Sequence, residues 1–181
     1  SHSAQIAKGF EMNVIAYDPF PNKQRAKQIG FTYVTLNNLL KKSDIITLHA
    51  PLNKKTHHLI NKKNIKILKR GVVLINTARG GLIDTEALLK ALNNKTISYA
   101  GLDVLEDEHA IKEEKEVLNP VFQKKHNLKT LLQEHLLLEL PNVYITPHNA
   151  FNSIEALQRI MDTTIDNIKA FVKKKPVNKV K

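Results

Sequence analysis

Cysteine is absent from this chain of 181 residues, and no apolar run approaches the roughly 20 residues that a membrane-spanning helix needs. The lack of cysteine excludes disulfides and thiolate chemistry. No signal peptide opens the sequence, so we expect a cytoplasmic protein with no membrane partner. No metal site is expected either.

Arginine and aromatic residues are scarce, although the formal net charge is +11. The excess is nearly all lysine, and aromatic side chains are not interleaved with the lysine clusters as a nucleic-acid stacking platform requires. We therefore interpret the charge as a solvated lysine-rich surface and predict no nucleic-acid partner. A basic nucleic-acid binder is the less favoured alternative. The four arginines are Arg25, Arg70, Arg79 and Arg159.

Short apolar segments rich in β-branched residues alternate with helical patterns along the chain. The helical patterns at 22–30 and 61–71 each end in a glycine, and Asp84 is placed to cap a helix that starts at Thr85. Nearly continuous apolar strands alternating with helices predict an α/β fold with a doubly wound parallel sheet. The predicted strands are residues 13–18, 44–49, 72–77, 99–104 and 143–148.

Two segments depart from this alternation. Residues 107–141 form a long charged insertion with a local helical pattern. The last predicted helix has one apolar stripe at three- and four-residue spacings. The stripe consists of Ile154, Leu157, Met161, Ile165, Ile168 and Val172.

Arg79 raises the first functional question, because it lies just past the buried apolar run of residues 72–75. In an open parallel sheet, ligands bind beyond the carboxyl ends of the strands. A guanidinium there can hold a carboxylate through two parallel hydrogen bonds. A salt bridge within the loop is the alternative for Arg79 taken alone. Other polar groups at strand ends, such as Asp103 and His148, favour the ligand site.

Asp18 ends the first predicted strand and precedes a proline, which by itself is typical of a turn. An acid at a strand end, about 20 residues after a glycine-rich phosphate loop, is also the ribose-binding acid of dinucleotide folds. Counting back from Asp18 puts that loop at or just before Ser1, and the chain does not contain it. Residues 1–12 then fit the helix that follows such a loop.

His148 follows the last predicted strand, and Glu106 and Glu108 follow the fourth, at the same edge of the sheet. A carboxylate beside a histidine favours the protonated ring and holds one tautomer. The sequence thus offers an arginine that can bind a substrate carboxylate, a histidine that can act as acid and base, and an aspartate that can bind the ribose of a dinucleotide. These three groups together suit one reaction. That reaction is hydride transfer between a nicotinamide and a 2-hydroxy or 2-oxo acid.

Five segments resemble, in order, blocks of the D-isomer-specific 2-hydroxyacid dehydrogenases, and most closely their D-lactate dehydrogenase-like branch. They are "VIAYDPF", "SDIITLHAPLNKKTHHLIN", "GVVLINTARGGLIDTEAL", "AGLDVLEDE" and "NVYITPHNAF". The resemblance implies a Rossmann-type NAD-binding domain and an NAD-dependent oxidoreductase that acts on a small 2-oxo or 2-hydroxy acid such as pyruvate or D-lactate. Phe151 stands where some lactate-type members have tyrosine-bearing sequence, which leaves the hydroxy acid open.

The same resemblance implies roles for individual residues. Arg79 would bind the substrate carboxylate, and His148 would donate the proton in reduction of the oxo acid. Glu108 would be the carboxylate partner of His148, with Glu106 as the alternative partner. Asp18 would take the adenosine ribose hydroxyls. The residues implied to line the nicotinamide cofactor are Ala50, Pro51, Thr56, Thr77, Ala78, Arg79 and Asp103.

The resemblance also implies a truncated chain, without the N-terminal part of the family's substrate-binding domain, the first strand and the glycine loop. That strand is central, between the second and fourth strands. We expect residues 1–150 to form an incomplete NAD-binding domain, with residues 107–141 as an insertion. Residues 151–181 would form a helix that in the family packs on the substrate-binding domain.

We expect the complete protein to be a homodimeric enzyme and the fragment alone to be inactive. A non-catalytic nucleotide-sensing interaction protein is the alternative, since a fold does not fix a function. The retained Arg79, Glu108 and His148 argue against that alternative, because a pure sensor does not need them.

Overall fold

A computed structural model describes residues 2–108 and 117–179, which fall into two units. The first unit spans Ser1–Thr146 and holds every strand that is described. The second unit spans Pro147–Lys181 and holds one long helix.

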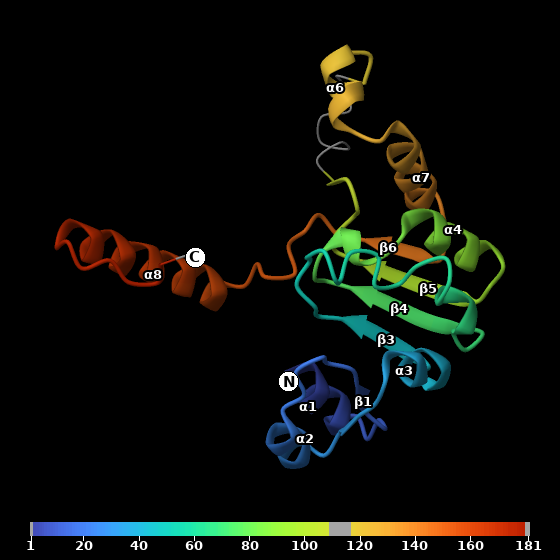
Figure 1. The fold of residues 1–181 in the computed structure, drawn as a ribbon, viewed down its shortest axis with the longest axis horizontal. Coiled ribbons are helices and arrows are strands. Elements are labelled where there is room, and N and C mark those ends of the chain that lie inside the picture. Colours follow the sequence, from blue (N-terminus) through green and yellow to red (C-terminus); the bar gives the residue numbers. More distant parts are fainter. Residues whose placement is uncertain (1, 109–116, 180–181) are drawn as a thin grey trace. The chain divides into compact units, whose positions relative to one another are not determined.

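The larger sheet of the first unit has four parallel strands in sequence order, which Figure 1 shows edge to edge. Leu74, in the middle of the second strand, lies opposite Ile46 on one neighbour and Ala100 on the other. The predicted parallel α/β sheet is thereby confirmed. The strands are β3 (Ile45–Leu48), β4 (Val72–Asn76), β5 (Ile97–Leu102) and β6 (Val143–Ile145).

The smaller sheet pairs β1 (Ile15–Ala16) with β2 (Thr32–Tyr33), also in parallel. Within the described residues, no ladder joins this pair to the larger sheet, so β1 and β3 are both edge strands. β1 is much shorter than the predicted strand 13–18, because only two of those residues find partners. The sequence analysis did not predict β2 or the helix that follows it.

The helices begin and end at residues that sequence rules favour. The side chain of Asn22 accepts a hydrogen bond from the Arg25 amide, and Asp84 does the same for Ala87. Gly30 ends its helix with φ +83°, a conformation that glycine adopts without strain. The helices are α1 (His2–Gly9), α2 (Lys23–Ile29), α3 (Leu36–Lys42), α4 (Thr85–Asn93), α6 (Pro120–Lys125), α7 (Leu128–Leu138) and α8 (Ile154–Val172).

One predicted helix is wrong. Residues 61–71 form turns around a short 3₁₀ helix, η1 (Ile65–Ile67), instead of an α-helix. The side chains of Asn61 and Asn64 hydrogen-bond to nearby main-chain groups, an arrangement that competes with helical bonding. The insertion 107–141 does contain helices, α6 and α7, and its residues 109–116 lie outside the described part of the chain.

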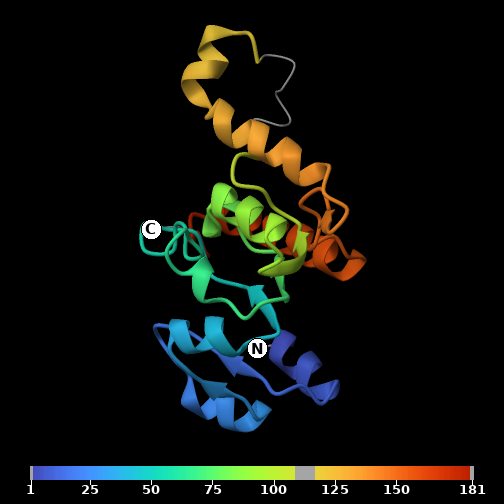
Figure 2. The same ribbon diagram turned by 90° about the vertical axis from the view of Figure 1, so that its right-hand side faces the viewer.

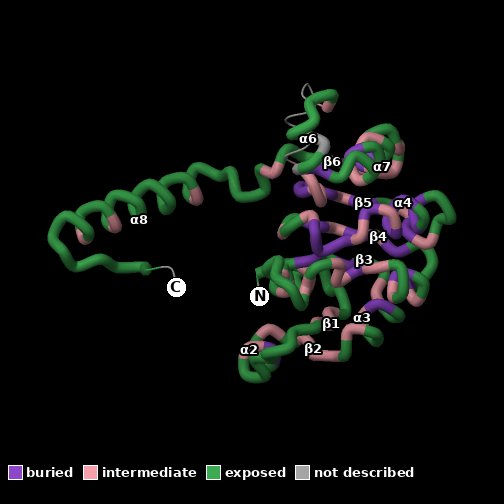
Figure 3. The backbone as a smooth tube through the Cα atoms, turned by 45° about the horizontal axis from the view of Figure 1, so that its top comes forward, coloured by how far each residue is buried: buried purple, intermediate pink, exposed green. Residues whose placement is uncertain are grey.

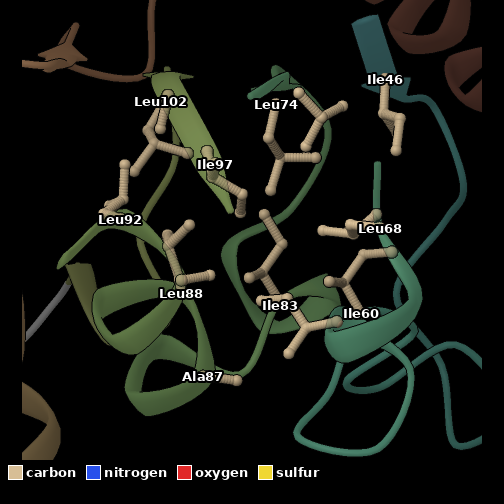
Figure 4. Packing of buried hydrophobic residues seen from close by; sticks show 14 of the residues in the cluster. Ile46, Ile60, Leu68, Leu74, Ile83, Ala87, Leu88, Leu92, Ile97 and Leu102 are labelled. Carbon is tan, nitrogen blue, oxygen red and sulfur yellow. The ribbon is translucent and has the colours of Figure 1, made fainter. Parts of the chain in front are cut away.

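The hydrophobic core lies between the larger sheet and the elements packed on it. Figure 4 shows Leu74 and Ile97 of the sheet facing Leu88 of α4 and Ile83 before it. α4 also contacts β5 and α7 (Figure 2). Buried residues are concentrated in β3, β4, β5 and α4 (Figure 3). This core holds the carboxyl ends of β4 and β5 in fixed relation to each other.

The single helix of the second unit has no buried residue. All six residues of its predicted apolar stripe are exposed, from Leu157 at 42% to Ile154 at 85%. Among the described residues, no helix is both long and apolar enough to cross a membrane.

Candidate active site at the carboxyl ends of the strands

The turn after β4 presents Arg79, and Asn76 closes that turn. The buried side chain of Asn76 donates to the Arg79 carbonyl (2.9 Å) and accepts from the Ala78 amide (3.1 Å). Thr77 is exposed and Ala78 half-buried within this turn. An asparagine at the last strand position can bond its own main chain a few residues on, which turns the chain sharply. The backbone of Arg79 is therefore anchored to the strand.

The guanidinium of Arg79 is exposed, and its Nη1 donates to the Ala78 carbonyl (2.6 Å). Of the carboxylates that the structure describes, none lies within ion-pair distance of Arg79. The salt bridge considered as the alternative for this residue is thus not found there. A fixed main chain with an exposed guanidinium suits a residue that binds an anion from solution.

Gly80 brings the turn after β4 against the segment after β5. A Cβ atom on Gly80 would lie 1.8 Å from the carbonyl oxygen of Leu105 and 2.5 Å from the amide nitrogen of Glu106. Only glycine permits this approach of two backbones. Arg79 is consequently held beside the segment that leads from Leu105 to Glu108.

Asp103, the residue after β5, is buried at the same edge of the sheet. Its amide donates to the Asn76 carbonyl (2.9 Å), and its carboxylate accepts from the Thr146 hydroxyl (2.5 Å). Asp103 thus ties the ends of β4, β5 and β6 together. Its position beside Asn76 confirms that the strand ends converge as the sequence predicts.

The segment after β3 forms a compact loop through Thr56. The Thr56 hydroxyl donates to the Pro51 carbonyl (2.6 Å) and accepts from the Asn53 amide (2.8 Å). Ala50 and Thr56 are half-buried, and Pro51 is exposed. An open hollow of about 380 Å³ adjoins this loop, lined by Leu52, Asn53, Lys54 and His57.

Both carboxylate oxygens of Glu106 accept hydrogen bonds from neighbouring elements. One carboxylate oxygen accepts from the Thr85 amide (3.2 Å) and hydroxyl (2.7 Å) at the start of α4, and the other accepts from His58 Nε2 (2.6 Å). Both carboxylate oxygens of Glu106 therefore have hydrogen-bond partners within the first unit. Sequence reasoning did not single out His58.

His57, His58 and Glu106 offer ligand atoms within 4.8 Å of one another. The two imidazole rings, however, stack with centroids 3.9 Å apart and an angle of 27° between their planes. A metal–imidazole bond lies in the ring plane and is about 2.0–2.1 Å long, and the planes of two stacked rings do not meet that close to their nitrogen atoms. This cluster is better described as a hydrogen-bonded link between the loop after β3 and Glu106.

Of the remaining predicted site residues, Glu108 and Asp18 belong to the first unit and His148 to the second. Glu108 is half-buried and follows the segment held beside Gly80. Asp18 is exposed just after β1, and one of its oxygens accepts from the Phe20 amide (2.8 Å), which is the turn contact that its following proline suggested. His148 belongs to the second unit and has φ +54°.

Comparison with known proteins agrees with this geometry. The family model described as D-isomer specific 2-hydroxyacid dehydrogenase, NAD binding domain, matches residues 1–150. The chain belongs to this family. It is 38% identical to D-lactate dehydrogenase of Escherichia coli over 167 residues, 91% of this chain and 47% of that protein. It is 40% identical to glycerate dehydrogenase of Methylorubrum extorquens, over 98% of this chain and 48% of that protein.

The fold of this 2-hydroxyacid dehydrogenase domain also matches solved structures. The D-lactate dehydrogenase of Aquifex aeolicus, solved with NAD and lactic acid, superposes with a TM-score of 0.84 at 40% identity. The match covers 95% of this chain and 50% of that one. The chain spans about half the length of the curated relatives it matches.

The site of this dehydrogenase domain fits a nicotinamide cofactor in part. Asp103, Ala78 and the Thr56 loop lie at strand ends of one sheet, where dinucleotide folds bind the cofactor. The residues that organise this edge but that sequence reasoning missed are Asn76, His58 and Thr146. Of these three, Asn76 gave a usable signal, because asparagine at a strand end is a common turn former.

Proposed function

We propose that the complete protein is an NAD-dependent D-2-hydroxyacid dehydrogenase that interconverts a small 2-oxo acid and its 2-hydroxy acid. The observation that carries the proposal is Arg79, whose exposed guanidinium stands on an anchored turn beside Asp103 and the segment leading to Glu108. Membership of the dehydrogenase family supports the same reaction. The bound nicotinamide supplies or accepts the hydride.

Arg79 binds the substrate carboxylate through two parallel hydrogen bonds, which fixes the neighbouring carbonyl in one orientation. His148 donates a proton to the carbonyl oxygen in the direction of reduction and takes it back in oxidation. Glu108 pairs with His148, favouring its protonated form and holding one tautomer.

Chain continuity supports His148 in this role. Thr146 is fixed at the sheet edge by hydrogen bonds to the Leu102 carbonyl and to Asp103. His148 follows this anchored residue by two positions in the chain. The same edge carries Arg79 and Asp103.

The cofactor in this proposal is NAD, lined by Ala50, Pro51, Thr56, Thr77, Ala78, Arg79 and Asp103. Asp18 accepts hydrogen bonds from the adenosine ribose hydroxyls, and its negative charge disfavours the 2′-phosphate of NADP. Equal catalytic efficiency with NADH and NADPH would contradict this assignment of Asp18.

We further infer the organisation of the complete protein. Residues 1–150 belong to the cofactor domain, and one more strand, with its glycine loop, pairs between β1 and β3. The exposed stripe of α8 packs on a substrate-binding domain. We propose that the complete protein is a cytoplasmic homodimer.

The experiment that tests the proposal follows NADH oxidation by the complete protein with a panel of 2-oxo acids. Arg79→Lys keeps the charge but loses the two-pronged contact, and one charged hydrogen bond is worth about 1.5–3 kcal/mol. We expect kcat/KM for the oxo acid to fall roughly ten- to a hundredfold, with NADH affinity unchanged. Arg25→Lys, at a half-buried position on α2, is the matched control.

His148→Ala in the same assay removes the general acid and should lower kcat by about a hundred- to ten-thousandfold. Glu108→Gln should move the pH profile of reduction to lower pH. Full activity of Arg79→Lys, or turnover of no 2-oxo acid by the intact protein, refutes the proposed reaction.

A further inference from the structure

The segment that leads to Glu108 is held from two sides. On one side, Glu106 is bound by Thr85 at the start of α4 and by His58. On the other side, the Asp107 amide donates to Glu134 Oε1 of α7 (2.8 Å). The Asp107 carboxylate accepts from His126 Nδ1 (3.0 Å). Both the main chain and the side chain of Asp107 are therefore fixed by the insertion.

Glu134 is an unexpected residue at its position. Its side chain is completely buried, on the same helix as the buried Leu131 and Leu137. Burial raises the pKa of Glu134 to about 7, against the opposing effect of the hydrogen bond from Asp107. Among the described residues, its Oε2 atom has no hydrogen-bond partner. A leucine at this position would avoid the free-energy cost of burying a carboxyl group. What the glutamate adds is the hydrogen bond with the Asp107 amide.

We propose that Glu134 and His126 are positioning residues that hold Glu108 for its pairing with His148. The inference rests on the proposed function, because Glu108 matters only if it assists His148. With Glu106 and Asp107 both fixed, little backbone freedom remains before Glu108. Catalytic groups tolerate little displacement, and a shift of about 1 Å can cost a hundredfold in rate. The insertion thus acts as a support for the catalytic segment.

The charged groups around Glu134 are few and can be separated by mutation. Asp107 and Glu106 face it from the segment after β5, and His126 lies next to Asp107. On α4, which packs against α7, Glu86 is paired with three lysines, Lys62, Lys90 and Lys129. Glu134→Leu removes the acceptor for the Asp107 amide and leaves these pairs intact.

The test measures kcat, NADH affinity, pH profile and Tm for variants of the complete protein. For Glu134→Leu we expect kcat to fall about tenfold or more. We also expect its pH profile of reduction to move to lower pH, as in Glu108→Gln but by less. NADH affinity and Tm should change little. Glu134→Gln keeps a carbonyl oxygen for the Asp107 amide and should retain most of kcat.

Two controls, one on the same helix and one at the residue that ends it, separate positioning from stability. Leu131→Ala opens a cavity in α7 and should lower Tm without moving the pH profile. Glu139→Gln changes an exposed carboxylate and should alter neither. If Glu134→Leu does not fold, His126→Phe removes the second contact to Asp107 and should give the same lower kcat and shifted profile.

The proposal fails if Glu134→Leu, or His126→Phe in its place, keeps the parent kcat and pH profile. It also fails if Leu131→Ala reproduces the shifted profile. Failure of the proposed function has a different signature, because Arg79→Lys would then leave turnover of every 2-oxo acid unchanged. In that case both proposals fall together.

Discussion

The two parallel sheets of the first unit are built from similar sequence but are buried to different degrees. β4 has a strand on each side, and its residues alternate between fully and partly buried. β1 has one neighbour, spans two residues and buries neither of them completely. The apolar runs "VVLIN" and "NVIA" have comparable β-propensity. The difference shows that neighbours, and not composition, decide how much of an apolar run becomes a buried strand.

The largest expected effect concerns activity. We predict that residues 1–181 alone do not transfer hydride, because, in the part of the chain that the structure describes, β1 and β3 each leave one row of backbone groups without a strand partner. Unpaired buried groups cost about 1–3 kcal/mol each, and a domain has only about 5–15 kcal/mol in total. The measurement compares NADH oxidation by this chain and by the complete gene product. Equal activity would show that β1 and β3 need no strand between them.

The core of the larger sheet should respond strongly to a cavity. Leu74→Ala, at a completely buried position of β4, should lower the free energy of unfolding by about 2–5 kcal/mol. Ile15→Ala, at a half-buried position of β1, should cost clearly less. Urea unfolding of both variants gives the two values. Equal losses would mean that the two sheets are equally well packed, and Ile97→Val is the milder substitute if Leu74→Ala does not fold.

Two glycine substitutions extend this comparison between closely packed and loosely packed parts of the first unit. Gly80→Ala places a Cβ within 2.0 Å of two backbone atoms of Leu105, so the two segments must separate. We expect a loss of stability of about 3 kcal/mol, the upper part of the range for overpacking. In α1, Gly9→Ala meets no atom within 4 Å and should stabilise the helix by about 0.5–1 kcal/mol. Thermal melts distinguish the two, and a tolerated alanine at position 80 contradicts the close approach.

The last effect is a gradual dependence of stability on pH. Because burial raises the pKa of Glu134 to about 7, folding disfavours its ionised form. The free energy of unfolding should therefore fall as pH rises from about 4.5, where the unfolded carboxyl ionises, to about 7. Glu134→Gln should flatten this decline, whereas Glu139→Gln should leave it in place. An unchanged slope in Glu134→Gln would contradict the burial of a titrating carboxylate.

Much of the fold and part of the site could be predicted from local sequence. Strand positions, the Asp84 and Gly30 caps and the convergence of strand ends follow from periodicity and capping rules. The helix at 61–71 could not be rejected from its pattern, because Asn61 and Asn64 act through side-chain contacts that compete with helical bonding. β2 was missed because it has only two residues, and α3, which is as long as α2, was missed because no glycine marks its end. The burial of Glu134 depends on contacts between α7 and a segment 27 residues earlier in the chain.

The sequence by itself determined that Arg79, Asp103 and their neighbours stand at the carboxyl ends of parallel strands, because strand order and polarity follow from alternating β-branched runs and helices. Tertiary structure alone decided that Asn76 anchors the Arg79 turn and that Gly80 meets the backbone of Leu105. It also decided that the Glu106 carboxylate is hydrogen-bonded to Thr85 and His58. The reason is that hydrogen bonds and close backbone contacts between distant segments depend on packing geometry, which leaves no periodic trace in the sequence.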